Sequence, residues 1–295
     1  MTMKRISITL ATAMLLVVGG CSNTEDVSVT SDEMKFMAEY PSVTRATASA
    51  FEPGDAIGVY VTKYIGDTST PLQVSGNYGN NSKAVFDGSV WNCSPAIYWD
   101  ESKFDVYAYY PYDKPASVDN YAFTIALDQT IPETADSLSS YEASDFLWAK
   151  TTGVSRMDVV PLTFQHRMSR FVICLQKGED YTGDIPSDAV VKIHNTIPVA
   201  DIDLASGIAT KNAYESAQSI TARKDDIGLY SAIIVPQRIE TRRPLVEVLV
   251  SGVSYLVEST FVFKSGTQHT MTITLNNNPD QVKIEIGGEI SSGWE

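Results

Sequence analysis

The chain has 295 residues, of which 43% are hydrophobic and 20% are charged, which is the balance of a folded globular protein rather than a disordered one. Its formal net charge of −14 argues against nucleic acid and anionic membrane surfaces as partners, because both attract clusters of Lys and Arg. Once an export signal is removed, roughly 270 residues remain, enough for one large β-domain or two ordinary ones.

The first 20 residues have the form of an export signal. Lys4 and Arg5 precede an apolar run from Ile6 to Val18, which is shorter than the roughly 18 residues that span a bilayer. The sequence VGGC, ending at Cys21, resembles the lipobox of bacterial lipoproteins, in which the cysteine is acylated and becomes the mature N-terminus. An ordinary signal with an incidental cysteine is the alternative. We therefore predict a signal peptide over 1–20 and a membrane contact made only by the acyl (palmitate-type) chains on Cys21.

A lone basic residue follows in the next segment, 21–45, which we predict to be a lipidated tether or pro-segment. Residues 22–35 are polar and acidic, and Arg45 is the one Lys or Arg between Phe36 and Thr62. A scissile arginine must lie in extended backbone to enter a protease cleft, and SVTRATASA has no helix pattern. A solvated linker arginine is the plain alternative.

Beyond Arg45 the apolar residues alternate almost everywhere, which predicts β-strands. The expected strands contain residues 57–61, 104–108, 121–127, 160–164, 171–175, 189–193, 229–235, 245–249, 261–263, 271–275 and 282–286. The only helix candidate is PETADSLSSYEA, residues 132–143. About a dozen short strands would overfill one sandwich of seven to nine. We therefore predict an all-β chain with two tandem β-sandwich domains, 46–158 and 159–295.

Candidate catalytic chemistry is sparse. His166, His194 and His269 are far apart, and no metal-ligand spacing, nucleophile elbow or phosphate-binding glycine loop is present. We predict no enzyme activity, no metal and no cofactor. Cys93 and Cys174 show no redox spacing, so buried thiols and a disulfide both remain open.

The aromatic run YAYYPY, Tyr107 to Tyr112, has two interpretations. Its rings could form a platform on which a sugar stacks. Equally, they could pack under a sheet in a strand that ends at a proline turn.

An ordered series of motifs carries a family resemblance. The lipobox, TRAT around Arg45, FEPGDAIGVY, FDVYAYYP after Trp99, LDQTIP, SDFLWAK and LTFQHRMSRFVICL follow one another along nearly the whole chain. Together they resemble the fimbrillin-like (Mfa-like) lipoproteins of Bacteroidales, the type V pilins. The resemblance implies two transthyretin-like β-sandwich domains, lipoprotein export to the outer surface, cleavage after an arginine by a trypsin-like protease, and polymerisation by donor-strand exchange.

Cleavage between Arg45 and Ala46 would separate the lipid anchor from the body. If residues before the cut, such as Val27, Val29 and the stretch from Met34 to Met37, form a strand in the precursor, their loss leaves an open sheet edge and an apolar groove. The best donor for such a groove is QVKIEIGGEI, in which Val282, Ile284 and Ile286 alternate with charged residues. This strand could also simply complete its own domain.

Two functions follow. The first is a non-enzymatic subunit of cell-surface fimbriae, in the stalk or as a tip adhesin, located at the outer membrane and then in the fimbrium. Its partners would be other fimbrial subunits, an Arg-specific maturation protease and a host glycan or protein receptor. The second is a monomeric, surface-anchored lipoprotein that binds glycans.

Overall fold

The computed structural model describes residues 32–41, 50–135 and 137–290, all of which belong to one compact unit that extends from Asp32. The predicted signal peptide, Cys21, Val27, Val29, Arg45 and Ala46 lie outside the described residues. Within the described part of the chain, no helix is long and apolar enough to cross a membrane.

The prediction of an all-β fold is confirmed. The strands of the first half are β1 (Phe36–Glu39), β2 (Ala56–Ile65), β3 (Thr68–Ser69), β4 (Gly79–Phe86), β5 (Trp91–Ser94), β6 (Phe104–Tyr110), β7 (Tyr121–Thr124), β8 (Leu147–Val154), β9 (Val160–Thr163) and β10 (Gln165–His166). Those of the second half are β11 (Ser169–Lys177), β12 (Val190–Thr196), β13 (Val199–Asp203), β14 (Ile208–Lys211), β15 (Gln218–Thr221), β16 (Arg223–Asp226), β17 (Leu229–Ile234), β18 (Gln237–Val250), β19 (Val253–Phe263), β20 (Gln268–Leu275) and β21 (Lys283–Ile290).

The helix candidate over 132–143 is not an α-helix in its described residues. In its described residues the backbone makes turns, and one short 3₁₀ helix, η1, covers Glu142–Ser144. The segment carries few apolar residues at helical spacing, so no continuous face could pack against a sheet. A second 3₁₀ helix, η2, covers Pro279–Gln281 just before β21.

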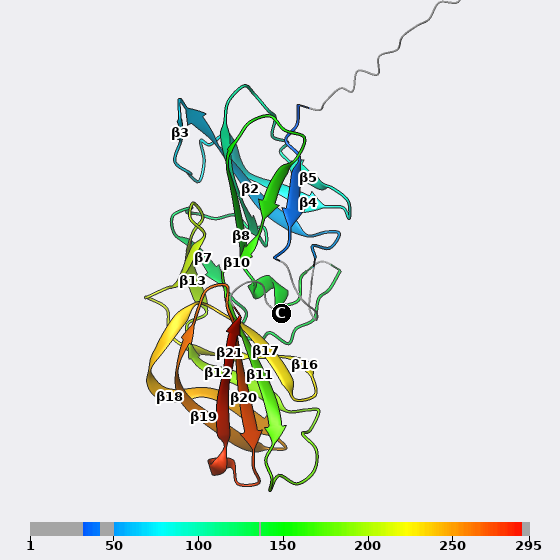
Figure 1. The fold of residues 1–295 in the computed structure, drawn as a ribbon, viewed down its shortest axis with the longest axis vertical. Coiled ribbons are helices and arrows are strands. Elements are labelled where there is room, and N and C mark those ends of the chain that lie inside the picture. Colours follow the sequence, from blue (N-terminus) through cyan, green and yellow to red (C-terminus); the bar gives the residue numbers. More distant parts are fainter. Residues whose placement is uncertain (1–31, 42–49, 136, 291–295) are drawn as a thin grey trace, which may run out of the picture. The chain divides into compact units, whose positions relative to one another are not determined.

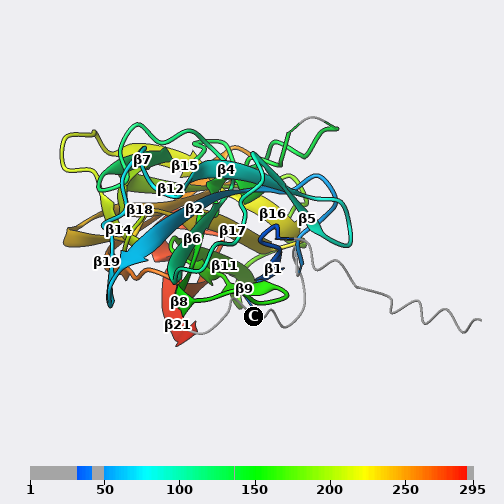
Figure 2. The ribbon, with the colours of Figure 1, turned by 90° about the horizontal axis from the view of Figure 1, so that it is seen from above.

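The first group of strands forms a seven-stranded sheet of antiparallel pairs, in the order β10-β8-β6-β2-β4-β5 with β3 joined to β2. Strand β6 lies in its middle, beside β2 (Figure 2), and all seven of its residues are buried. Phe104, Val106 and Ala108 share one face, as predicted, and pack into one apolar cluster. Tyr107 and Tyr109 point the other way and belong to a second cluster. This strand therefore lies between two cores. Both of its faces are buried, so neither faces solvent.

The second group forms a five-stranded sheet, β16-β17-β11-β20-β21, and a four-stranded sheet, β15-β12-β18-β19. Both sheets contribute to one apolar cluster, in which Ile173 and Met271 from the first sheet join Val191 and Val248 from the second. In Figure 1 the red strand β21 lies beside β20, with which it pairs antiparallel.

Alternation over 245–249 predicts that Leu245, Glu247 and Leu249 share the inward face of β18, and this is only partly right. Leu245 is buried as expected, but Val246, Val248 and Val250 are buried too, while Leu249 is 40% exposed. The pairing with β19 shifts register between Pro244 and Val246, and such a bulge turns every following side chain to the opposite face.

The predicted division into domains 46–158 and 159–295 remains a prediction. Strands β9 and β10, which follow residue 158, pair with β1 and β8 respectively. Strand β7 pairs with β13 in a three-stranded sheet, β14-β13-β7.

Candidate functional site

The segment 32–41, here called the leader strand, is hydrogen-bonded to two different parts of the chain. Near its start, the backbone N–H of Met34 donates to the carbonyl of Ile97 and the N–H of Trp99 donates to the carbonyl of Asp32, both at 2.7 Å. Its later part is β1, which pairs parallel with β9 and lies beside it in Figure 2. We call the space between residues 97–99 and 160–163, which the leader strand fills, the leader slot.

Alternate side chains of the leader strand enter the apolar cluster on that side of the sheet. Met34 and Phe36 are only 1% and 5% exposed, and Ala38 and Tyr40 pack against the same cluster. The intervening Met37 is 49% exposed. Burying Met34 and Phe36 stabilises the folded chain by roughly 1.5–3 kcal/mol each. Emptying the slot would therefore expose an apolar groove that a new strand could occupy.

Tyr40 ends the leader strand at an aromatic group centred on Phe51. The centroid of the Phe51 ring lies 5.1 Å from Tyr40, 5.0 Å from Trp91 and 5.4 Å from Phe164. Burial, followed by the negative charge of Asp145, raises the pKa of Tyr40 well above its ordinary value, so the phenol stays neutral. Phe51 follows the predicted cut site and Tyr40 precedes it, so after cleavage only non-covalent packing would join the two rings.

The predicted donor residues lie at the other end of the chain. Ile284 and Ile286 are on β21, an edge strand, and are 39% and 53% exposed, while Val282 precedes the strand and packs against the second core. On the neighbouring strand β20, Ile273 pairs with Ile284 and Met271 pairs with Ile286. An edge strand with exposed apolar side chains is an open template for pairing with another chain.

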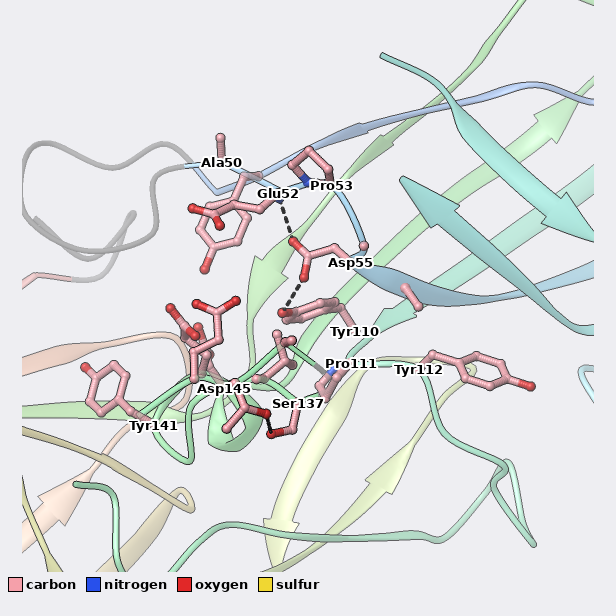
Figure 3. Close-up of a pocket in the computed structure, with 18 of the residues that line it drawn as sticks. Ala50, Glu52, Pro53, Asp55, Tyr110, Pro111, Tyr112, Ser137, Tyr141 and Asp145 are labelled. Atoms are coloured by element: carbon pink, nitrogen blue, oxygen red, sulfur yellow. Dashed lines mark hydrogen bonds between the residues drawn. The ribbon is translucent and has the colours of Figure 1, made fainter. Parts of the chain in front are cut away.

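A cavity of about 340 Å³ lies at the end of the leader strand. Figure 3 shows part of its lining, which includes Asp55, Tyr110, Ser137, Tyr141 and Asp145. Tyr40, Arg170 and Arg223 also line it.

Asp55 organises the upper wall of this cavity. Its carboxylate accepts hydrogen bonds from the Glu52 backbone N–H at 2.7 Å and from the Tyr110 hydroxyl at 3.0 Å, as the dashed lines in Figure 3 show. Burial raises the pKa of Asp55 above its ordinary value, although both hydrogen bonds oppose that shift. The wall therefore holds a carboxyl group that is fixed in orientation and partly withdrawn from water.

The lower wall combines buried charged and aromatic groups. His166 Nδ1 lies 2.8 Å from a carboxylate oxygen of Asp145. The guanidinium of Arg223 stacks on the Tyr141 ring at 3.6 Å and its Nε donates to Asp225 at 2.8 Å.

The arrangement offers binding groups rather than a metal centre. Among the described residues, no group of three or more His, Cys, Asp and Glu side chains could hold a metal ion. His194 contacts Ser219 and Glu247, and His269 accepts a hydrogen bond from the Lys264 backbone, so the three histidines stand at separate places. Cys93 and Cys174 are both free thiols, and burial raises the pKa of Cys93 to about 11.

Sequence reasoning found only part of the cavity. The aromatic run supplied Tyr110 and Tyr112 as candidates, but Asp55, Arg170 and Arg223 were missed because they are distant in sequence. A weak signal was available for Arg170, since a charged residue inside the apolar stretch RFVICL needs a buried partner.

The comparisons with known proteins identify the family. The family model described as fimbrillin-like matches residues 44–294, and the chain belongs to this family. Fimbrillin-like proteins are structural and adhesion proteins and are in general not enzymes. The comparison with curated proteins found no match.

Solved structures with a similar fold include two putative cell adhesion proteins and a fimbrial protein. The adhesion protein from Bacteroides ovatus has 21% identity and a TM-score of 0.70, over 89% of this chain and 98% of its own. The adhesion protein from Bacteroides uniformis has 20% identity and a TM-score of 0.65, over 88% and 97%. The Bacteroides ovatus fimbrial protein has 15% identity and a TM-score of 0.50, over 84% and 49%. At these identities the likeness concerns the fold alone.

Proposed function

We propose that this protein is a structural subunit of cell-surface fimbriae that is exported as a lipoprotein, cleaved after Arg45 and polymerised by donor-strand exchange. One observation carries the proposal: the strand just before the predicted cut site buries its alternate side chains in a slot of the body. Cleavage would detach that strand covalently and leave a slot ready for a strand of another subunit.

The slot is a strong acceptor because its two sides offer both hydrogen bonds and apolar pockets. Residues 97–99 and 160–163 would each present unpaired backbone groups once the leader strand leaves. The pockets of Met34 and Phe36 would be exposed to water at the same time. An incoming strand that satisfies both needs is recognised by its backbone and held in register by its side chains.

The C-terminal strand matches the pockets in sequence. If Ile284 takes the place of Met34, then Ile286 takes the place of Phe36 and Gly288 that of Ala38. This register puts the two large apolar residues into the two fully buried pockets and a residue without a side chain where the leader strand has its smallest. A shift by one residue would put Lys283 and Glu285 into the same pockets.

Assembly then follows from geometry. The slot and the donor strand are different surfaces of one subunit, so the contact is head-to-tail and repeats without closing, which produces a filament. The partners are other fimbrial subunits and an Arg-specific protease, with a host glycan or protein as the receptor. The family favours a surface location, and the lipid on Cys21 would hold the precursor at the outer membrane until cleavage.

Mass spectrometry of the mature N-terminus tests the processing step. The expected product begins at Ala46, and Arg45→Ala should leave a folded, lipidated and unassembled chain. Arg242→Ala serves as a matched control, because it removes an exposed arginine on β18 that does not contact the leader strand. A lipidated Cys21 on all protein recovered from assembled fimbriae would reject the proposal.

A peptide experiment tests the exchange step. A chain that starts at Ala46 should bind a synthetic peptide of residues 281–290 and gain stability, by about 2.7 kcal/mol when the peptide is at 100 times its Kd. A peptide with Ile284 and Ile286 changed to Asp is the control. Equal stabilisation by both peptides would show that binding does not depend on the apolar side chains at positions 284 and 286.

A further inference from the structure

We propose that the cavity of about 340 Å³ beside Tyr40 and Asp55 is a binding site for a neutral hexose unit of a glycan. Strand exchange uses the leader slot and does not use this cavity. The inference therefore goes beyond filament assembly and concerns what the assembled or unassembled subunit recognises.

The charge of the lining excludes an acidic ligand. Five carboxyl groups and three cations face the cavity, the carboxyls being Glu52, Asp55, Glu133, Glu142 and Asp145 and the cations Lys83, Arg170 and Arg223. An anion that entered would meet more negative than positive charge at short range in a partly desolvated site.

The guanidinium groups of Arg170 and Arg223 argue against a simple cation as the ligand of this cavity. Arg170 is 8% exposed, and its Nε has no hydrogen-bond partner among the described residues. Nη2 of Arg223 also has no hydrogen-bond partner among the described residues, while Nε of the same side chain donates to Asp225. Buried donors of this kind need an acceptor, which a cation does not provide.

A sugar hydroxyl meets both requirements, because it donates one hydrogen bond and accepts others. Its O–H can donate to the carboxylates of Glu142 or Asp55, and its oxygen can accept from Arg170 or Arg223. A ring that carries several hydroxyls presents these functions in several directions at once. The mixture of carboxylate acceptors and guanidinium donors among the lining residues therefore fits a polyhydroxyl compound.

The apolar part of the wall fits the C–H face of a sugar. Tyr110, Pro111 and Tyr112 follow one another along one side of the cavity in Figure 3. Tyr112 is half-buried, with the ammonium of Lys83 5.3 Å from its ring centroid. The volume lies near the lower end of the roughly 300–1,000 Å³ usual for small-molecule sites, so it admits one or two sugar rings rather than a long chain.

Saturation-transfer NMR on the full chain tests the site, with Arg45→Ala in the background so that Tyr40 remains in the wall. The probes are methyl α-D-mannoside, methyl β-D-galactoside and methyl β-D-glucoside, with D-glucuronate as the acidic probe and lysine methyl ester as the cationic one. We expect saturation of at least one neutral glycoside and none of the charged probes.

Variants locate the signal. Tyr112→Ala and Glu133→Gln, both at positions with solvent access, should each weaken binding roughly tenfold or more, the equivalent of losing one good contact. Tyr214→Ala, at a tyrosine that is 97% exposed and outside the cavity, should leave binding unchanged. The proposal is overturned if no neutral glycoside is saturated, if a charged probe binds instead, or if both cavity variants bind as the parent does.

Discussion

The leader strand and the C-terminal strand β21 both have apolar residues at alternate positions. The apolar side chains are more deeply buried in the leader strand than in β21. Phe36 of β1 is 5% exposed, because its side chain packs into an apolar cluster of the body. Ile286 of β21 is 53% exposed, because the strand lies at the edge of its sheet and pairs on one side with β20. The strand that is tightly held stands next to the predicted cut, and the strand that is loosely covered has the apolar side chains to replace it.

The contrast teaches that alternation alone does not fix burial. Both strands would be assigned one apolar face from sequence. The difference comes from what lies opposite that face: the apolar cluster that contains Phe51 for β1, and partly solvent for Ile284 and Ile286. In energetic terms, the two strands differ by the apolar area that each removes from water.

The largest effect is expected at Phe36. Phe36→Ala in the uncut Arg45→Ala chain should lower the free energy of unfolding by about 3–5 kcal/mol, because it leaves a cavity in the core. Met37→Ala, at the exposed neighbouring position, should change it by less than about 0.5 kcal/mol. Urea unfolding measures both. Equal losses of stability in the two variants would contradict the burial of Phe36, since they would mean that the leader strand does not pack as described.

A smaller effect on stability, but a complete effect on assembly, is expected at Ile286. Ile286→Asp should change the unfolding free energy of the monomer by less than about 1 kcal/mol, since the side chain is more than half exposed. The same substitution should abolish denaturant-resistant oligomers, whereas Ile286→Val should retain them. Oligomers that persist in the Asp variant would show that β21 is not the donor.

A third effect concerns the pH dependence of stability at Asp100, which follows the segment 97–99 beside the leader slot. The ammonium of Lys63, and after it the backbone N–H of Ser102, lowers the pKa of Asp100. A carboxyl with a lowered pKa stabilises the folded state above its ordinary pKa of about 4, and that contribution is lost as pH falls through the lowered value. Asp100→Asn should therefore lower the melting temperature by less than about 2 °C at pH 7, because solvent screens the pair.

The pH dependence provides the control for this prediction. The difference in melting temperature between Asp100→Asn and the parent should shrink as pH falls below 4. A difference that grows on acidification would contradict the assignment, since it would require a raised pKa.

The smallest effect is expected at the start of the leader strand. Arg156 pairs with Asp32, but both side chains are more than half exposed. Arg156→Ala should cost about 0–0.5 kcal/mol in unfolding free energy, and the loss should vanish in high salt. A larger loss would indicate that the ion pair, rather than the apolar side chains, holds the leader strand in place.

Much of the fold could be predicted from local patterns. The expected strands at 57–61, 104–108, 160–164 and 271–275 correspond to β2, β6, β9 and β20, because each alternates over a sheet with at least one buried face. Strands β4 and β5 were missed, since their sequences GNNSKAVF and WNCS contain polar residues that interrupt the apolar alternation, although β4 lies between β2 and β5 and only β5 is at the edge of the sheet. The face of β18 was wrong after Leu245, because a bulge follows Pro244; the proline inside the strand was the available signal, but the size of the register shift is set by pairing with β19.

The sequence by itself determined the all-β class, the family and the alternating segments, since these depend on residue type and spacing along the chain. Only the tertiary structure decided that the leader strand pairs parallel with β9, that β6 separates two cores, and that Arg170 and Asp55 line one cavity. These features join residues that are distant in the chain. Their free energy comes from burial and pairing in three dimensions, and no local pattern encodes which distant partner provides it.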